Sequence, residues 1–305
     1  MTEATAPAPG SALDPDRALS PSPTARFFLR ARGHTSILVG GGILLFIVLM
    51  ALFAPLLAPH DPYDQDLFNR LKPPFWMEGS SPAHPLGTDN LGRDYLSRVI
   101  YGAQISLLIG ICAATLSGII GSALGVTAGY FGGRVDAVIT FIITTRLSMP
   151  IVLVALAVVA LVGGSLEAVI LVLGLLLWDR YAVVMRSATQ QARSMDYVAA
   201  ARAIGCPTWR IVLSEIMPNV VNNLIVIATF EVAHAILLEA ALSFLGLGVQ
   251  PPAPSWGLMI AEGKEFLLFD PWVIAIPGVA LSILVLAVNM LGDGVRDVSA
   301  PENRS

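Results

Sequence analysis

Long apolar runs, separated by short polar segments, dominate the chain. The first run covers residues 37–57 and carries no charge, and its length matches the roughly 20 residues that a helix needs to cross a bilayer core. Five further runs meet this criterion, and Arg146 and Pro150 interrupt one of them. These runs cover residues 105–130, 137–162, 166–184, 220–244 and 272–291. The pattern predicts an all-α membrane protein with six transmembrane helices.

Polar segments divide the chain around these spans. Residues 1–36 begin with Ala, Pro and Ser and scattered acids, a composition that buries little apolar surface and predicts a largely disordered segment. A polar loop, 58–98, follows the first span, and residues 99–292 contain the other five. The longest loop in this core is 186–217, and a short tail, 293–305, closes the chain.

Arginine and lysine indicate the orientation, because cytoplasmic loops carry an excess of both. With the N-terminus inside, 12 of the 18 basic residues lie in cytoplasmic segments, 5 lie outside and Arg146 lies within a span. Both termini and loop 186–217 are therefore predicted to be cytoplasmic. Loop 58–98 is predicted to be extracytoplasmic.

Composition excludes other classes of protein. Apolar residues make up 55% of the chain and charged residues 13%, with a mean hydropathy of +0.73, whereas soluble domains are about 25% charged. The net charge of −4 provides no basic field for nucleic acid. Two cysteines, Cys112 and Cys206, are too few for a disulfide framework or a Cys/His metal cluster. Membrane lipid is the expected environment, and no metal site is predicted.

Loop 186–217 has the sequence of a helical hairpin. Its Ala-rich part, 196–204, favours a helix, with Asp196 placed to cap it or to complement its dipole. Gly205 suits the end of that helix, and Pro207 suits the first turn of the next. The hairpin either merely connects two spans or presents small residues to another protein.

Several motifs, in chain order, resemble the permease subunits of binding-protein-dependent ABC importers. Loop 186–217 is similar to that family's EAA motif, with Ala200, Ala201, Gly205, Ile211 and Pro218 at the matching positions. More narrowly, the chain resembles the second permease (dipeptide permease C type) of the dipeptide, oligopeptide and nickel branch. The segments that carry this resemblance are HPLGTD at 84–89, GRD at 92–94, EAALSFLGLG at 239–248, PSWG at 254–257 and GDG at 292–294.

The resemblance implies the type I ABC importer permease fold in a bacterial plasma membrane. In that arrangement this chain and a second permease form the pore, two cytoplasmic ATPases bind ATP and Mg²⁺, and an external binding protein delivers substrate. The hairpin would dock on one ATPase, and ATP-driven closure would switch the spans between discrete arrangements. The residues expected at this contact are Asp196, Tyr197, Ala200, Ala201, Arg202, Gly205, Arg210 and Pro218.

The chain departs from the family pattern in two places. Ala199 stands where the EAA motif has its Glu, and Ser214-Glu215 stands where the branch carries Arg-His. The second change turns a cationic patch acidic. We therefore expect the matching ATPase surface to differ in charge, with coupling retained.

The chain lacks the motifs of an ATPase or an intramembrane enzyme. A phosphate-binding loop needs Gly, four spacers and Gly-Lys-Ser/Thr, but the only Gly-Lys pair, Gly263-Lys264, precedes Glu265. Neither His-Glu-x-x-His nor Gly-x-Ser-x-Gly occurs. No catalytic residue and no cofactor bound by this chain are predicted, and ATP hydrolysis is expected from partner subunits.

Three ionisable residues, Glu231, His234 and Glu239, lie in the predicted fifth span. They fall within a helical arc of about 140°, and charges in a membrane tend to face water or each other. One interpretation is a polar wall of the substrate pathway, with Glu231 attracting a peptide's amino terminus or a cation. The other is architectural, with Glu231 and His234 as a buried hydrogen-bonded pair. Arg146 either extends to the cytoplasmic side or pairs with Glu231.

Loop 58–98 is rich in proline and carries acidic and aromatic side chains. It either caps the pore or forms part of a dock for the binding protein. The residues predicted for this dock are Trp76, Asp89 and Arg93, with Trp256 from the second outside loop.

Three classes of function compete. The leading one is a permease subunit that imports short peptides, with nickel or another small solute as the alternative cargo. A proton-coupled secondary transporter is the second class, but the inverted repeats typical of such folds are not found. An intramembrane enzyme is the third, and the missing motifs disfavour it.

Overall fold

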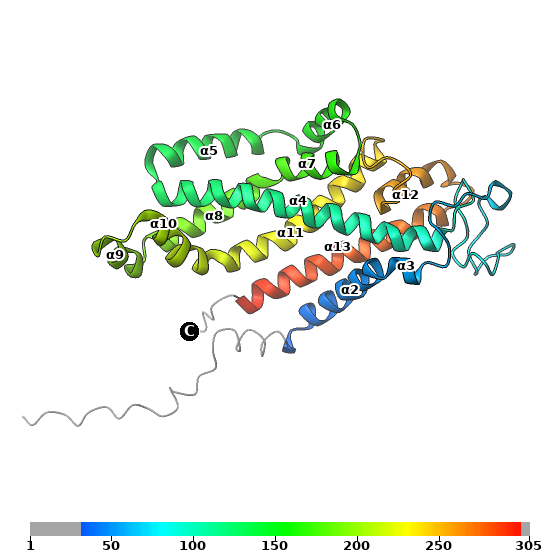
Figure 1. Ribbon diagram of the computed structural model, residues 1–305, viewed down its shortest axis with the longest axis horizontal. Helices are drawn as coiled ribbons and strands as arrows, with labels where there is room; N and C mark the ends of the chain where they lie inside the picture. The colour runs from blue at the N-terminus through cyan, green and yellow to red at the C-terminus, as the bar shows by residue number, and fades with distance from the viewer. Residues whose placement is uncertain (1–31, 300–305) are drawn as a thin grey trace, which may run out of the picture.

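The computed structural model describes residues 32–299, which fold into helices that mostly run along one axis (Figure 1). Two isolated bridges are the only β-structure in this range. The α-helices are α2 (Thr35–Leu52), α3 (Ala54–Leu57), α4 (Tyr95–Phe131), α5 (Gly133–Leu147), α6 (Ile151–Val162), α7 (Leu166–Leu176), α8 (Trp178–Arg193), α9 (Asp196–Ala203), α10 (Thr208–Arg210), α11 (Met217–Phe244), α12 (Trp256–Gly263) and α13 (Trp272–Ser299). Two 3₁₀ turns, Leu67–Asn69 and Lys264–Phe266, and a π-helical turn, Ile211–Ile216, complete the order.

The third predicted span, 137–162, is not one continuous helix. α5 and α6 meet at an angle of 84°. Pro150 occupies the N-cap of α6, and a helix rarely runs through proline because the ring removes an N–H and restricts the preceding residue. Five helical stretches within residues 32–299 are long and apolar enough to cross a membrane, and the bent pair makes a sixth. The prediction of six spans is confirmed with α5 and α6 counted as one broken span.

The second span begins earlier than predicted. α4 starts at Tyr95 and not near residue 105, and the side chain of Asp94 caps it by accepting a hydrogen bond from the Ser97 N–H at 2.8 Å. Arg98, assigned to loop 58–98 from its charge, is instead buried in the first turn of α4. Arginine is compatible with a helix, and Glu262, 2.9 Å from the guanidinium, compensates the buried charge.

Two other predicted boundaries change. α8 continues to Arg193, and α9 and α10 follow it, so much of loop 186–217 is helical. α13 continues to Ser299, so the described part of the predicted tail 293–305 is helix. The disorder predicted for 1–36 falls mainly on residues 1–31, which lie outside the described range, as do residues 300–305.

The two ends of the described chain lie on one side of the bundle. Figure 1 shows the start of α2 and the end of α13 toward the end that carries α9 and α10, here called the α9 end. The connection from α3 to α4 lies with α12 at the opposite end, here called the α12 end. This arrangement agrees with an even number of crossings. That the α9 end is cytoplasmic stays a prediction from the basic residues.

α4 packs on α8 through glycines. Gly118, Gly121, Gly125 and Gly129 lie three or four residues apart along α4, all facing α8. A Cβ atom at Gly125 would lie 2.5 Å from the Ala182 carbonyl oxygen. Small residues let helix backbones approach closely, which is how helices associate in lipid, where no hydrophobic difference drives them together.

We predict that Gly125→Leu strongly destabilises the protein. Its side chain meets backbone atoms of α8 that cannot move aside, so the loss should reach or exceed the roughly 1–3 kcal/mol that is typical of overpacking. The measurement is the apparent melting temperature of the purified chain in detergent. Gly42→Leu is the matched control, because nothing lies within 4 Å of a Cβ at Gly42. Equal melting temperatures for the two variants would contradict this packing.

Candidate coupling segment and translocation pathway

α9 ends in a glycine turn at one extremity of the molecule. Gly205 has φ +79°, its N–H donates to the Arg202 carbonyl at 3.0 Å, and the Cys206 N–H donates to the Ala201 carbonyl at 3.0 Å. This pair of bonds is a Schellman motif, in which glycine adopts the left-handed conformation at little cost. The prediction that Gly205 ends the helix is confirmed, whereas Pro207 lies just before α10 and not inside it.

The start of α9 distinguishes between the two roles predicted for Asp196. Asp196 is its first residue, but Met195 holds the N-cap position and no side chain makes a capping bond. The carboxylate of Asp196 therefore acts only through its charge near the positive end of the helix dipole. Of the two roles predicted for Asp196, the side-chain cap is absent and the interaction with the helix dipole is the one that the structure supports.

The tip of this hairpin presents apolar side chains to its surroundings. Ile204 is 80% exposed and Trp209 is 65% exposed, while Val198 faces inward and is fully buried. Such an apolar surface rimmed by charge is typical of a protein contact site. Seven of the eight residues predicted for coupling are exposed, namely Asp196, Tyr197, Ala200, Arg202, Gly205, Arg210 and Pro218, and Ala201 is buried.

A cluster of charges lies between α8 and α11. Glu231 is fully buried, and its carboxylate lies 3.4 Å from Nη1 of Arg180 and 3.1 Å from Nδ1 of His234. The expected pairing of Glu231 with His234 is present. Arg146 does not pair with Glu231, because its guanidinium donates to the Leu176 carbonyl at 2.7 Å. Arg180, with 54% of its side chain exposed, is the member of the cluster that faces outward.

Glu239 occupies a separate, closed site near the end of α11. It is fully buried and accepts hydrogen bonds from the hydroxyls of Ser243 at 2.7 Å and Ser255 at 2.9 Å. A Cβ at Gly257 would lie 2.8 Å from its other oxygen. These contacts tie α11 to the start of α12, which favours the architectural interpretation of Glu239.

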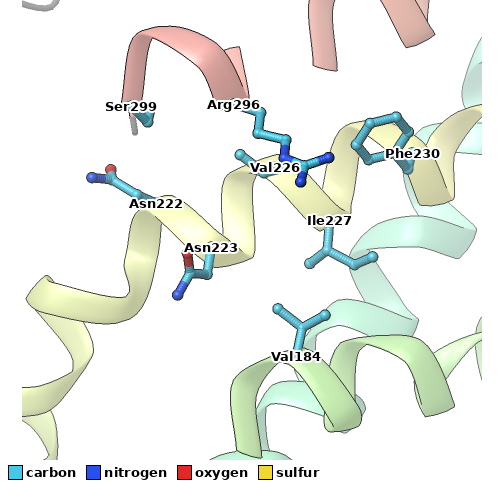
Figure 2. A pocket seen from close by; sticks show the side chains of 8 residues that line it. All are labelled: Val184, Asn222, Asn223, Val226, Ile227, Phe230, Arg296 and Ser299. Carbon is cyan, nitrogen blue, oxygen red and sulfur yellow. The ribbon is translucent and has the colours of Figure 1, made fainter. Parts of the chain in front are cut away.

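A groove of about 510 Å³ opens between α8, α11 and α13 (Figure 2). Val184 lines it from α8, Ile227 and Phe230 from α11, and Arg296 from α13. Val184 lies one helical turn from Arg180 and Ile227 lies one turn from Glu231, so the groove runs along the faces that carry the charged cluster.

Most residues predicted for a dock belong to the interior of the α12 end. Arg93 binds Asp89 through Nε at 2.6 Å, and both side chains are buried. Trp256 is buried as well and donates its indole N–H to the Val99 carbonyl at 2.9 Å. Burial does not fit direct contact with a docked protein, and of the four predicted residues Trp76 alone is exposed.

Sequence reasoning missed three charged partners in these sites. Arg180 was counted among the cytoplasmic basic residues although it falls within the predicted span 166–184, and a charge within a span is itself a signal of a partner. Arg98 and Glu262 were read as loop charges. Their pairing across 164 residues has no signal in a single sequence.

Comparison with known proteins identifies the family. The profile of the binding-protein-dependent transport system inner membrane component matches residues 121–305, and that of the N-terminal TM domain of oligopeptide transport permease C matches residues 22–74. The chain belongs to this permease family. Of the function classes considered, membership selects the permease subunit of an ABC importer, a multi-pass protein of the bacterial inner membrane.

Relatives of this permease cover nearly its whole length. The di/tripeptide transport system permease protein of Pseudomonas aeruginosa is 40% identical over 92% of this chain and 93% of its own. The dipeptide permease of Haemophilus influenzae is 37% identical (92% and 95%), and the glutathione permease of Pectobacterium atrosepticum 36% (93% and 93%). An inward-facing structure of the MetNI methionine ABC transporter matches with a TM-score of 0.54 and 19% identity, covering 67% of this chain and 97% of that one. It supports the fold alone.

We predict that Arg180 and Glu231 are energetically coupled. Arg180→Ala leaves a buried carboxylate with His234 as its one remaining partner, so the permease should lose stability, and adding Glu231→Gln should restore part of it. A double-mutant cycle on unfolding in detergent should give a coupling of about 0.5–3 kcal/mol, as for contacting pairs. The same cycle with Arg146→Ala in place of Arg180→Ala should be additive. Coupling absent from the first cycle would refute the ion pair.

Proposed function

We propose that this permease forms half of the translocation pore of an ATP-driven importer for short peptides. A second permease completes the pore, and an external binding protein delivers the peptide. The relatives named for dipeptides, di/tripeptides and glutathione support this cargo. Nickel or another small solute is the alternative cargo within the same branch.

The observation that carries the proposal is the hairpin of α9 and α10. It extends from the bundle (Figure 1), and a defined glycine turn joins its two helices. Ile204 and Trp209 are exposed on it. We assign it to a groove on a cytoplasmic ATPase that binds ATP and Mg²⁺, so that this chain supplies no catalytic residue. Arg202, whose guanidinium lies 5.1 Å from the centre of the Tyr130 ring, ties α9 to the end of α4.

The groove of Figure 2 is the proposed inner part of the pathway. Its lining residues Val184 and Ile227 lie one helical turn from Arg180 and Glu231, and the side chain of Arg180 is half exposed. Because Glu231 is buried behind Arg180, the cluster presents a cation to the pathway and not the carboxylate expected from the sequence. A peptide's terminal carboxylate is the group that such a cation attracts.

Uptake by intact cells tests the cargo. Cells that lack this permease should take up a radiolabelled dipeptide poorly, and expression of the chain should restore uptake. An excess of unlabelled dipeptide should reduce uptake of the labelled dipeptide, whereas a nickel salt should not. Restored nickel uptake with unchanged dipeptide uptake would contradict the peptide assignment and favour the alternative.

We predict that Gly205→Ala impairs dipeptide uptake more than Gly246→Ala does. Both glycines have positive φ, +79° and +82°, both end a helix in the same pair of backbone bonds, and neither Cβ would meet an atom within 4 Å. Each substitution therefore adds the same strain of roughly 1–2 kcal/mol. Gly205 lies in the hairpin of α9 and α10, whereas Gly246 follows the C-terminal end of α11. Because only Gly205 belongs to the proposed coupling segment, its substitution should reduce uptake more. Equal uptake at equal protein level would contradict it.

A further inference from the structure

Two of the four histidines converge on one carboxylate at the α12 end. Nδ1 of His84 lies 2.9 Å from Oδ1 of Asp94, and Nδ1 of His60 lies 3.7 Å from the same oxygen. The two imidazole rings lie 4.8 Å apart, centre to centre. An ordinary hydrogen bond to Asp94 accounts for His84. It leaves the second ring, directed at the same oxygen, unexplained.

The spacing fits a metal ion. All three residues offer ligand atoms within 4.8 Å of one another. Ligands at about 2.0–2.1 Å from a tetrahedral Zn²⁺ are roughly 3.3 Å apart, and the two observed distances to Asp94 bracket that value. Two imidazoles and one carboxylate are a donor set that late first-row metals favour, and it leaves coordination positions for water.

The carboxylate is already oriented for this role. Oδ2 of Asp94 accepts hydrogen bonds from the Ser97 backbone N–H at 2.8 Å and the Ser97 hydroxyl at 2.7 Å. That hydroxyl in turn accepts a hydrogen bond from the backbone N–H of His60 at 3.1 Å. The other oxygen, Oδ1, faces the two imidazoles. Outer partners that fix ligands in this way are a regular part of metal sites.

The surrounding cavity is acidic and open. It measures about 300 Å³, and Asp61, Asp64 and Asp66 line it together with the three candidate ligands. Their negative charge favours a divalent cation, and the opening gives the ion access from solvent.

We propose that His60, His84 and Asp94 bind a divalent late transition-metal ion such as Zn²⁺. The three ligands belong to the segment after α3, to the turn at residues 81–87 and to the N-cap of α4. The bound ion joins these segments and stiffens the α12 end. This site is independent of the proposed transport of peptides. Sequence analysis predicted no metal site because the ligands are scattered over 35 residues and include no cysteine.

Zinc binding by the full-length chain tests the proposal. The chain is purified in detergent with a histidine-free tag, stripped with a chelator, and titrated with ZnCl₂ alone in equilibrium dialysis with elemental analysis. Wild type should bind about one ion at this site. His60→Ala should weaken binding by at least the roughly 10–100-fold that loss of an outer partner causes. His34→Ala is the matched control, because His34 lies beside a single carboxylate, that of Asp297, at 3.4 Å. This variant should bind zinc as wild type does.

Thermal unfolding provides a second readout. His60 is 40% exposed, so His60→Ala should fold normally and melt like wild type in the absence of zinc. Zinc should raise the melting temperature of wild type and of His34→Ala but not that of His60→Ala, since a ligand stabilises only the state that binds it. Wild type that binds no zinc at micromolar concentration, or His60→Ala that binds it equally well, would overturn the proposal.

Discussion

The contact between the backbones of α4 and α8 is the constraint on which the other features depend. Gly121, Gly125 and Gly129 bring α4 against the main chain of α8, so α4 has no side chains at these positions that could repack. α8 carries Arg180 near its start and leads into α9 after Arg193. The charged cluster and the exposed hairpin therefore belong to one rigid unit. A push on α9 must move that unit as a whole, because closely packed interfaces switch between arrangements and do not deform continuously.

Paired charges join this unit to its neighbours. Arg186 of α8 binds Asp136 of α5 with Nη2 at 2.7 Å from the carboxylate, and Arg180 binds Glu231 of α11. At the α12 end, Arg98 of α4 reaches Glu262 of α12. Charges in an apolar bundle are costly unless they meet a partner. Each pair therefore fixes how two helices meet, and the pairs select one arrangement among the many that apolar surfaces alone would permit.

Apolar length predicted the helices, and the motifs predicted the family, because both signals are local in the chain. The glycine turn at Gly205 was predictable for the same reason. The bend at Pro150 was visible as a proline, but its 84° angle depends on how α6 packs on α7. Partners distant in sequence were not predictable: Arg180 with Glu231, Arg98 with Glu262, and His60 with His84 and Asp94. Interior charges such as Asp89 and Arg93 were assigned to a surface because charge alone does not reveal a buried partner.

Site-directed crosslinking tests most directly whether the α9 end meets an ATPase. Ile204→Cys, in a chain whose Cys112 and Cys206 are replaced by serine, is labelled with a photoactivatable maleimide in native membranes and irradiated, and the adducts are identified by mass spectrometry. Leu268→Cys, an exposed position at the α12 end, is the control. We expect an adduct between residue 204 and an ATPase subunit and none from residue 268. An ATPase adduct from residue 268 and none from residue 204 would contradict this contact.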